Sequence, residues 1–392
     1  MRPSRSMRIL MLADMKPDLN SGAAGTELHL ADELATLGHE VVGVWSDDLP
    51  HRIRHWNLHH LIEQPRAFRD AIRRLNRDGG FDVYHVNQPA GWLAARAHRH
   101  ERRRGLFVHR SHGFEPRIGA VVQRWRRTFP EDRRSPWRRV ATTALASLLA
   151  RHHRWIAREA EAHVVSCTEC ADFLVAWGVR RDHILVSPQV PVDGFFSAPL
   201  APWSAERARR LLYVGQHAFF KAPMVVAAVL AEMLAGDPDL EATWVAEPEA
   251  HGAIHQRLTH AGSAERVTLR GWMEQERLCE VYDAHGLFLF PSFTEGFGKV
   301  FLEAMARGLA VVATAQGGAR DLIIDGENGL LAPVGDVIGL VTQLRRVRTE
   351  EGLAERLAAE GRRTAERHTW RGAAASLADF YSELLAAKGR GE

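Results

Sequence analysis

Cysteine, long apolar runs and lysine are all scarce in this chain of 392 residues. Its three cysteines, Cys167, Cys170 and Cys279, are too few for a disulfide framework, which excludes a disulfide-rich secreted domain and favours a reducing compartment. The apolar run at residues 8–13 is too short for a secretory signal. No apolar window approaches the roughly 20 residues of a membrane-spanning helix. We therefore expect a cytoplasmic protein.

Charge of one sign is also lacking, because the formal net charge is only +3. The only lysines are Lys16, Lys221, Lys299 and Lys388. Eleven arginines fall between Arg117 and Arg158, yet no nucleic-acid-binding module is present, so nucleic acid is not an expected partner. At this length, two domains of an ordinary globular protein are expected.

Short apolar runs alternate with longer amphipathic stretches, a pattern typical of a parallel sheet with crossover helices. The expected strands are residues 8–13, 41–46, 83–87, 106–111, 163–167, 183–189, 210–216, 242–247, 267–271, 286–292, 310–315 and 328–333. The sequence therefore predicts an α/β protein with two facing Rossmann-like domains. The expected parts are a domain at 1–190, a linker at 191–203, a domain at 204–365 and a helix at 366–392 that packs back toward the first domain.

Polar, glycine-containing segments follow several of these strands, where ligands bind in open α/β sheets. The loop at 14–27 holds Gly22 and Gly25, whose spacing does not make a dinucleotide fingerprint, so we interpret Asp47 as a turn residue. His112 follows the strand at 106–111 and is a candidate for binding a sugar or phosphate.

Two further strand ends carry charged side chains beside predicted helix starts. Pro223 suits the first turn of a helix, which would place Lys221 just outside its N-terminus, a ready anion site. The run from Glu295 to Lys299 exposes glycine N–H groups before another helix. Eight helical residues from Glu295 to Glu303 would rise about 12 Å, beyond the roughly 5–9.5 Å of a glycosidase pair. We therefore expect the two acids to bind different parts of one long ligand.

The stretch E-G-F-G-x-x-x-x-E-A-M-A-x-G at 295–308, after a strand that ends in P-S, resembles the signature of the family-4 (group 1) retaining glycosyltransferases of GT-B fold. The likeness covers nearly the whole chain, including GHEVVGV (38–44), SHGFE (111–115), YVGQHAFFK (213–221) and the unit at 317–336. One departure is Gln216, where the family usually has arginine. Diphosphate charge would then fall to Lys221, His217 or another arginine.

The resemblance assigns roles to individual residues. Glu295 would hold the hydroxyls of the donor sugar, Glu303 those of the ribose, and Lys221 the diphosphate, while His112 would lie near sugar and phosphate. The expected catalytic residues are Glu295, His112 and Lys221. The expected donor-binding residues are Gly22, Gly215, Gln216, Lys221, Trp272, Met273, Glu295, Gly296, Phe297, Gly298, Lys299 and Glu303.

The resemblance implies a retaining transfer of a sugar from a nucleotide-diphosphate donor to a glycan, lipid-linked or small-molecule acceptor. No metal or other cofactor is expected. Asp237-Pro-Asp239 spells D-x-D but is interpreted as a turn, and Cys167 and Cys170 as structural. Two alternatives stay open: a nucleotide-sugar epimerase of GT-B fold, and a non-catalytic sugar-nucleotide-binding protein.

Residues 137–158 are predicted to form a helix with an apolar stripe and a basic face. The stripe consists of Trp137, Val140, Ala141, Ala144, Leu145, Leu148, His152 and Trp155, with Arg138, Arg151, Arg154 and Arg158 largely outside it. The helix either faces the core with its stripe, or lies on an anionic membrane where a lipid-linked acceptor would be found. In the second case the protein would be peripheral at the inner membrane face.

Overall fold

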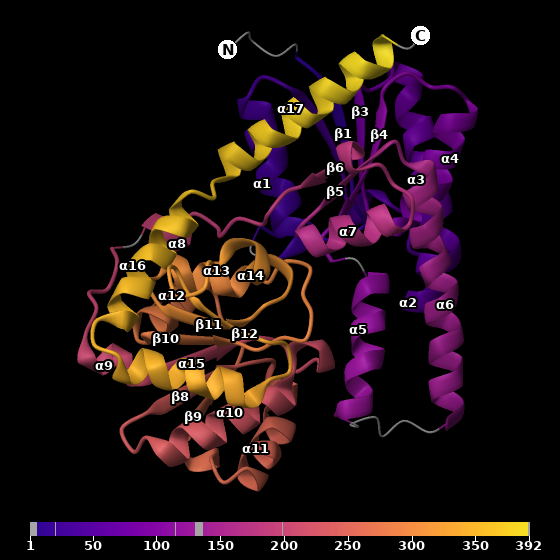
Figure 1. Ribbon diagram of the computed structural model, residues 1–392. Helices are drawn as coiled ribbons and strands as arrows, with labels where there is room; N and C mark the ends of the chain where they lie inside the picture. Colours follow the sequence, from indigo (N-terminus) through magenta and orange to yellow (C-terminus); the bar gives the residue numbers. More distant parts are fainter. Residues whose placement is uncertain (1–5, 20, 114, 130–135, 198, 391–392) are drawn as a thin grey trace. The chain divides into compact units, whose positions relative to one another are not determined.

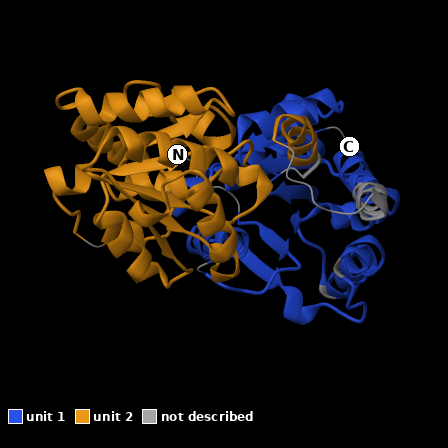
Figure 2. Cartoon of the chain, turned by 90° about the horizontal axis from the view of Figure 1, so that it is seen from below, with its two compact units in different colours: residues 1–117, 131–188, 370–392 blue, residues 118–130, 189–369 orange. Residues whose placement is uncertain are grey.

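The computed structural model describes residues 6–19, 21–113, 115–129, 136–197 and 199–390 (Figure 1). The chain divides into two compact units (Figure 2). Unit 1 comprises Met1–Arg117, Glu131–Pro188 and Trp370–Glu392, and unit 2 comprises Ile118–Pro130 and Gln189–Thr369. Helix α5, Glu115–Thr128, therefore begins in unit 1 and belongs to unit 2 from Ile118 onward.

In its described residues, unit 1 contains a six-stranded sheet of order β2-β1-β3-β4-β5-β6 in which every pairing is parallel. Its strands are β1 Arg8–Leu12, β2 Glu40–Val44, β3 Val83–Asn87, β4 Leu106–Ser111, β5 Ala162–Val165 and β6 Ile184–Val186. Its helices include α1 Ala23–Thr36, α2 Trp56–Leu58, α3 Gln64–Leu75, α4 Trp92–His100, α6 Pro136–Glu159, α7 Thr168–Ala176 and α17 Trp370–Gly389. Strands β3, β4 and β5 are buried along their length, as expected of parallel strands covered on both faces.

The C-terminal helix α17 packs on unit 1. The ring of Trp370 stacks on His29 of α1 at 4.6 Å between centroids. The hydroxyl of Tyr381 lies 2.5 Å from Nδ1 of His85 in β3, and burial raises the pKa of Tyr381 well above its usual value. Residues far apart in the sequence thus share one core.

Unit 2 repeats the arrangement with a second six-stranded parallel sheet in the described residues, of order β12-β11-β10-β7-β8-β9. Its strands are β7 Arg210–Val214, β8 Glu241–Val245, β9 Val267–Arg270, β10 Leu287–Phe290, β11 Ala310–Thr314 and β12 Leu330–Ala332. Its helices include α8 Gly194–Ser197, α9 Ala205–Ala208, α10 Pro223–Gly236, α11 His251–His260, α12 Gln275–Asp283, α13 Lys299–Ala306, α14 Gly317–Leu322, α15 Val337–Thr349 and α16 Leu353–Glu366. Each of the twelve predicted strands is confirmed.

Three local expectations were wrong. The loop predicted at 14–27 ends early, because α1 begins at Ala23 and places Glu27 inside the helix. The helix predicted at 366–392 begins later, at Trp370, because the chain leaves the helical conformation between α16 and α17. The segment at 191–203, expected to be a linker, lies with unit 2 and contains α8, where the buried Arg307 donates to the carbonyl of Phe195.

One stretch in the described residues, Phe219–Gly236, is long and apolar enough by composition to cross a membrane. The sequence reading did not single it out. Its helical part, α10, buries Val225, Val229 and Met233 in the hydrophobic core of unit 2. Its apolar composition is accounted for by this packing.

Helix α6 has the predicted bounds within one residue. The side chains of Trp137, Val140, Ala141, Ala144 and Leu145 in the predicted stripe, and that of Arg138, lie outside the described residues. Further along, His152, His153 and Ile156 are buried, whereas Leu148 is 43% and Trp155 40% exposed. The core-facing side of the helix is therefore rotated from the predicted stripe, which leaves two apolar side chains exposed.

Candidate functional site

The connection from β10 to α13 is a buried turn that requires glycine. Gly298, the residue before α13, has a φ of 92°. A Cβ there would come within 2.3 Å of the Phe290 ring. Ser292 donates to Oε1 of Glu295 at 2.8 Å, and Thr314 donates to the carbonyl of Ser292 at 2.7 Å. Glu295 is thus held in a fixed, buried position.

Lys221 forms an ion pair with Glu295, with 2.6 Å between Nζ and Oε1. It ends a short 3₁₀ turn, and Ala222 in the left-handed region leads into α10, which starts at Pro223. The prediction that Lys221 stands just outside a helix N-terminus is confirmed. An ammonium group beside the free N–H groups of a helix start makes a strongly anion-attracting position.

Glu303 lies one turn into α13, with its Oε2 3.3 Å from the hydroxyl of Tyr282. Burial raises the pKa of Glu303 above its usual value, opposed by the charge of Lys299, the Tyr282 hydrogen bond and the charge of Lys221. Burial likewise lowers the pKa of Lys299, opposed by Glu303. Two lysines and two glutamates therefore form one electrostatic cluster.

The spacing argument for the two glutamates was incorrect, although both are in the site. Glu295 precedes α13, which starts at Lys299, so a helical rise of about 12 Å does not separate them. Lys221 pairs with Glu295 and also acts on the pKa of Glu303. The two acids share one cationic neighbour.

The remaining predicted residues of unit 2 follow neighbouring strands. Gly215 follows β7 and is buried, and a Cβ there would lie 2.7 Å from the Tyr213 hydroxyl. Gln216 is exposed, and the next N–H, of His217, donates to both carboxylate oxygens of Glu247 at 3.0 Å. After β9, Met273 is partly buried and Trp272 half exposed. Because the strands are parallel, these ends lie along one edge of the sheet.

An aromatic cluster beside Glu295 was not found from the sequence. Phe293 stacks on Trp125 of α5 at 4.8 Å between ring centroids. The rings of Phe129 and Phe219 each lie 5.5 Å from the ring of Phe293. These contacts pack residues 118–129 against the rest of unit 2. Trp125 belongs to an arginine-rich helix with no local pattern that would connect it to residue 293.

In unit 1, His112 follows β4 and pairs with Glu27 of α1 at 2.9 Å. The other oxygen of Glu27 lies 2.9 Å from Nε2 of His85. Burial would raise the pKa of Glu27, but His85 and His112 hold it well below the usual value. Sequence reasoning missed Glu27, although an acid following a glycine loop was the available signal. Gly22 precedes α1 and is exposed.

The side chains interpreted as structural have structural roles. Asp237 ends α10, pairs with Arg348 at 2.6 Å and accepts the N–H of Asp239, so the predicted turn is confirmed. Asp47 lies in a short 3₁₀ turn and is exposed. Cys167 and Cys170 are buried, with their sulfurs 3.4 Å apart.

Residues 208–350, which contain the Lys221–Glu295–Glu303 cluster, match the family model of group 1 glycosyl transferases. The predicted resemblance to group 1 glycosyltransferases is therefore confirmed.

Relatives with curated names are similar to this chain over much of its length. The D-inositol 3-phosphate glycosyltransferase of Streptomyces bingchenggensis is 28% identical over 336 residues, covering 79% of this chain and 68% of the relative. The enzyme of the same name from Thermobispora bispora is 32% identical over 235 residues, which cover 56% of this chain and 54% of the relative.

Solved structures establish the fold of this chain. Sucrose-phosphate synthase from Thermosynechococcus elongatus matches with a TM-score of 0.75 at 20% identity, covering 97% of this chain and all of that one. HepE of Anabaena, solved in complex with UDP-glucose, matches with a TM-score of 0.65 at 18% identity over 97% of this chain and all of that one. The predicted GT-B fold is confirmed.

Proposed function

We propose that this protein is a retaining glycosyltransferase that takes its sugar from a nucleoside diphosphate without a metal ion at the donor site. The observation that carries this is the buried cluster of Lys221, Glu295 and Glu303 at two helix starts. The UDP-glucose bound by HepE, which shares the fold, supports the donor class. The three cysteines are buried and form no disulfide among the described residues, which fits a cytoplasmic location.

Donor binding would rearrange the ion pair. A diphosphate at the start of α10 competes with Glu295 for Lys221, because the ammonium can bind either anion at short range. Once released, Glu295 can accept hydrogen bonds from the hydroxyls of the sugar. Glu303 accepts those of the ribose, and each charge-assisted bond contributes on the order of 1.5–3 kcal/mol.

The transfer breaks the bond between the anomeric carbon and the diphosphate oxygen. The acceptor hydroxyl attacks the same face, the leaving phosphate oxygen takes its proton, and the nucleoside diphosphate departs with the bonding electrons. Lys221 and the N–H groups of α10 would stabilise the charge on that phosphate as it develops. The roles of His112 and Gly22 toward the donor stay predictions from the family resemblance.

Acceptor-dependent release of nucleoside diphosphate tests this function. A thermal-shift screen with UDP, GDP, ADP and their sugars first identifies the donor, because a bound ligand stabilises the folded state. Lys221→Ala is expected to abolish the shift, whereas Lys16→Ala, at an exposed lysine of unit 1, leaves it unchanged. Release without acceptor, or binding with no release under any acceptor, would favour the epimerase or the non-catalytic reading.

We also propose that α6 binds an anionic membrane, which would bring the enzyme to a lipid-linked acceptor. Leu148 and Trp155 are exposed apolar side chains, and Arg151, Arg154 and Arg158 are exposed on the same helix. Apolar and cationic side chains together are the combination that interfacial helices use.

A further inference from the structure

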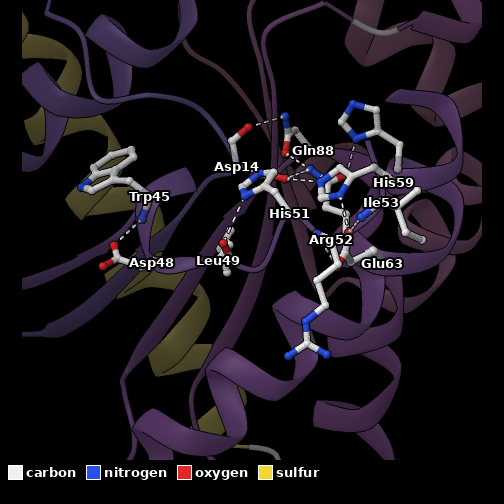
Figure 3. Close-up of polar contacts among 12 residues, drawn as sticks. Asp14, Trp45, Asp48, Leu49, His51, Arg52, Ile53, His59, Glu63 and Gln88 are labelled. Atoms are coloured by element: carbon white, nitrogen blue, oxygen red, sulfur yellow. Dashed lines mark hydrogen bonds and ion pairs between the residues drawn. The ribbon is translucent and has the colours of Figure 1, made fainter. Parts of the chain in front are cut away.

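A second polar cluster lies in unit 1, at the carboxyl end of β1 (Figure 3). Asp14 follows β1, and its side chain is 4% exposed. Its Oδ1 lies 2.8 Å from Nε2 of His51, and its Oδ2 lies 2.8 Å from Nε2 of His59. The two imidazole rings are stacked, with centroids 4.8 Å apart. Both rings therefore direct the same nitrogen at one carboxylate.

The other nitrogen of each ring already has an acceptor. Nδ1 of His59 lies 3.0 Å from Oε2 of Glu63, and Nδ1 of His51 lies 3.1 Å from the carbonyl of Leu49. Because these acceptors require a proton on Nδ1, each neutral ring turns the Nε2 lone pair toward Asp14. Lone pairs facing a carboxylate repel it, unless a second proton or a cation lies between them. The same arrangement is what orients histidines at metal sites.

The outer groups are themselves held in place. Glu63 accepts the N–H groups of Arg52 and Ile53 at 3.0 and 2.9 Å. These bonds, together with His59, outweigh burial and lower the pKa of Glu63 to about 2. Gln64 donates to Oδ2 of Asp14 at 2.9 Å. The carboxylate and both rings are thus pre-oriented by a second layer of hydrogen bonds.

We propose that Asp14, His51 and His59 bind a divalent transition-metal ion of the zinc class. Two imidazole nitrogens and one carboxylate oxygen are a ligand set that such ions accept, with an open position left for water. The candidate ligand atoms lie within 4.8 Å of one another. Bond lengths of about 2.0–2.2 Å place tetrahedral ligand atoms roughly 3.3 Å apart, so small shifts would complete the site. His51 is 46% exposed, which gives an ion access from solvent.

The proposed ion serves unit 1 and not the donor cluster, whose residues all belong to unit 2. It would tie the segment at 51–63 to the end of β1. The competing explanation is an ionic triad without metal, in which one or both rings carry a second proton. Burial lowers the pKa of His59, but Asp14 and Glu63 outweigh it and raise the pKa, so the protonated ring competes with the ion.

Cobalt provides the test, because tetrahedral Co²⁺ bound by nitrogen and oxygen absorbs strongly in the visible range. The full chain is stripped with EDTA, dialysed and titrated with Co²⁺, and its zinc content is measured separately by mass spectrometry. We expect uptake of about one ion per chain, with the absorption abolished by added Zn²⁺. No absorption and no zinc uptake by the wild-type chain would overturn the proposal in favour of the protonated triad.

Three variants locate the ion. His51→Ala, at a half-exposed ligand whose loss should not disturb folding, is expected to abolish the absorption. Glu63→Gln is expected to weaken binding about 10- to 100-fold, since it removes only an orienting group. The control is His55→Ala, at an exposed histidine of the same segment. This variant should bind Co²⁺ as the wild type does. Equal binding by His51→Ala and wild type would also contradict the site. Circular dichroism of each variant confirms folding independently of any enzymatic activity.

Discussion

At the scale of single residues, the two glutamates of the Lys221–Glu295–Glu303 cluster have different neighbours and should have different roles. The carboxylate of Glu295 contacts Lys221 and Ser292. The carboxylate of Glu303, which lies in α13, contacts the hydroxyl of Tyr282 in α12. Under the proposed function, Glu295 binds the hydroxyls of the transferred sugar, and Glu303 binds the ribose hydroxyls of the nucleotide. Substitutions can separate these two contributions because a bare nucleoside diphosphate lacks the sugar.

Glu303→Ala is expected to raise the KM for the donor and to weaken binding of the bare nucleoside diphosphate. Loss of charge-assisted hydrogen bonds worth about 1.5–3 kcal/mol corresponds to roughly 10- to 150-fold in affinity. Glu295→Gln should mainly lower kcat, because contacts to the sugar tighten as the anomeric carbon gains positive charge. It should leave diphosphate affinity unchanged or increase it, since Lys221 is released from its pair.

Isothermal titration of both variants with the bare diphosphate and the intact donor measures this difference. The exposed Glu249→Ala in the same unit serves as a control for nonspecific loss of charge. Equal weakening of the bare diphosphate by Glu295→Gln and Glu303→Ala would contradict the division of roles.

The raised pKa of Glu303 makes nucleotide binding sensitive to mild acid. The ionised carboxylate accepts ribose hydroxyls, and protonation removes part of that capacity. Because burial raises the pKa, affinity for the diphosphate should begin to fall at a higher pH than an ordinary glutamate would cause. The measurement is the dissociation constant against pH for wild type and Glu303→Gln. The variant retains only the titration of the ligand phosphate, so identical curves for the two proteins would refute the assignment.

At the scale of elements, α6 presents apolar and basic side chains on its exposed side, and the proposed membrane contact depends on both. Each arginine near an anionic surface contributes about 1 kcal/mol, and this attraction weakens as salt shortens the Debye length below about 10 Å. Replacing Arg151, Arg154 and Arg158 with glutamine should therefore reduce co-sedimentation with anionic vesicles. Added salt should reduce wild-type binding in the same direction.

A matched variant keeps the overall charge change but moves it to unit 2. Replacement of the exposed Arg209, Arg277 and Arg345 should leave vesicle binding at the wild-type level. Equal recovery of the wild type with neutral and anionic vesicles would rule out the electrostatic contact, and α6 would then simply have a solvated basic face.

Elements were predictable from the sequence wherever one segment contains the whole signal. The twelve strands are buried in parallel sheets and so appear as apolar runs. Lys221 and Glu295 were found because Pro223 and Gly298 mark helix starts within a few residues of them. The local sequence pattern was insufficient where tertiary packing decides which face of a helix is buried. In α6, for example, His153 is buried and Trp155 is exposed, the reverse of the predicted stripe.

Contacts between distant segments were not predictable in the same way. The stacking of Trp125 on Phe293 and the meeting of Asp14 with His51 and His59 depend on the folded chain. A count of 21 histidines gives no indication of which ones converge. The sequence therefore pointed to Lys221, Glu295 and Glu303, which lie in family motifs and meet in one cluster, and missed the cluster at the end of β1.

At the scale of the whole molecule, the two units differ in the electrostatic means by which they would bind ligands. Unit 2 offers an ammonium group and helix N-termini to an anion, and unit 1 offers imidazoles and a carboxylate to a cation. If both proposals hold, chelation of metal should affect only unit 1. The thermal shift produced by the nucleoside diphosphate should then be the same with and without EDTA.

The same experiment separates the proposals from each other. The wild type in the presence of excess EDTA, and His51→Ala without EDTA, should both lack the stabilisation that Zn²⁺ gives to the metal-stripped wild type, because binding to the folded state alone raises the midpoint of unfolding. Both should keep the full shift caused by the diphosphate. If EDTA abolishes the diphosphate shift and Mg²⁺ or Mn²⁺ restores it, the donor site itself uses a metal, and Lys221 with the start of α10 does not suffice to neutralise the diphosphate. Loss of the shift in His51→Ala without EDTA would instead mean that the cluster at β1 also supports nucleotide binding.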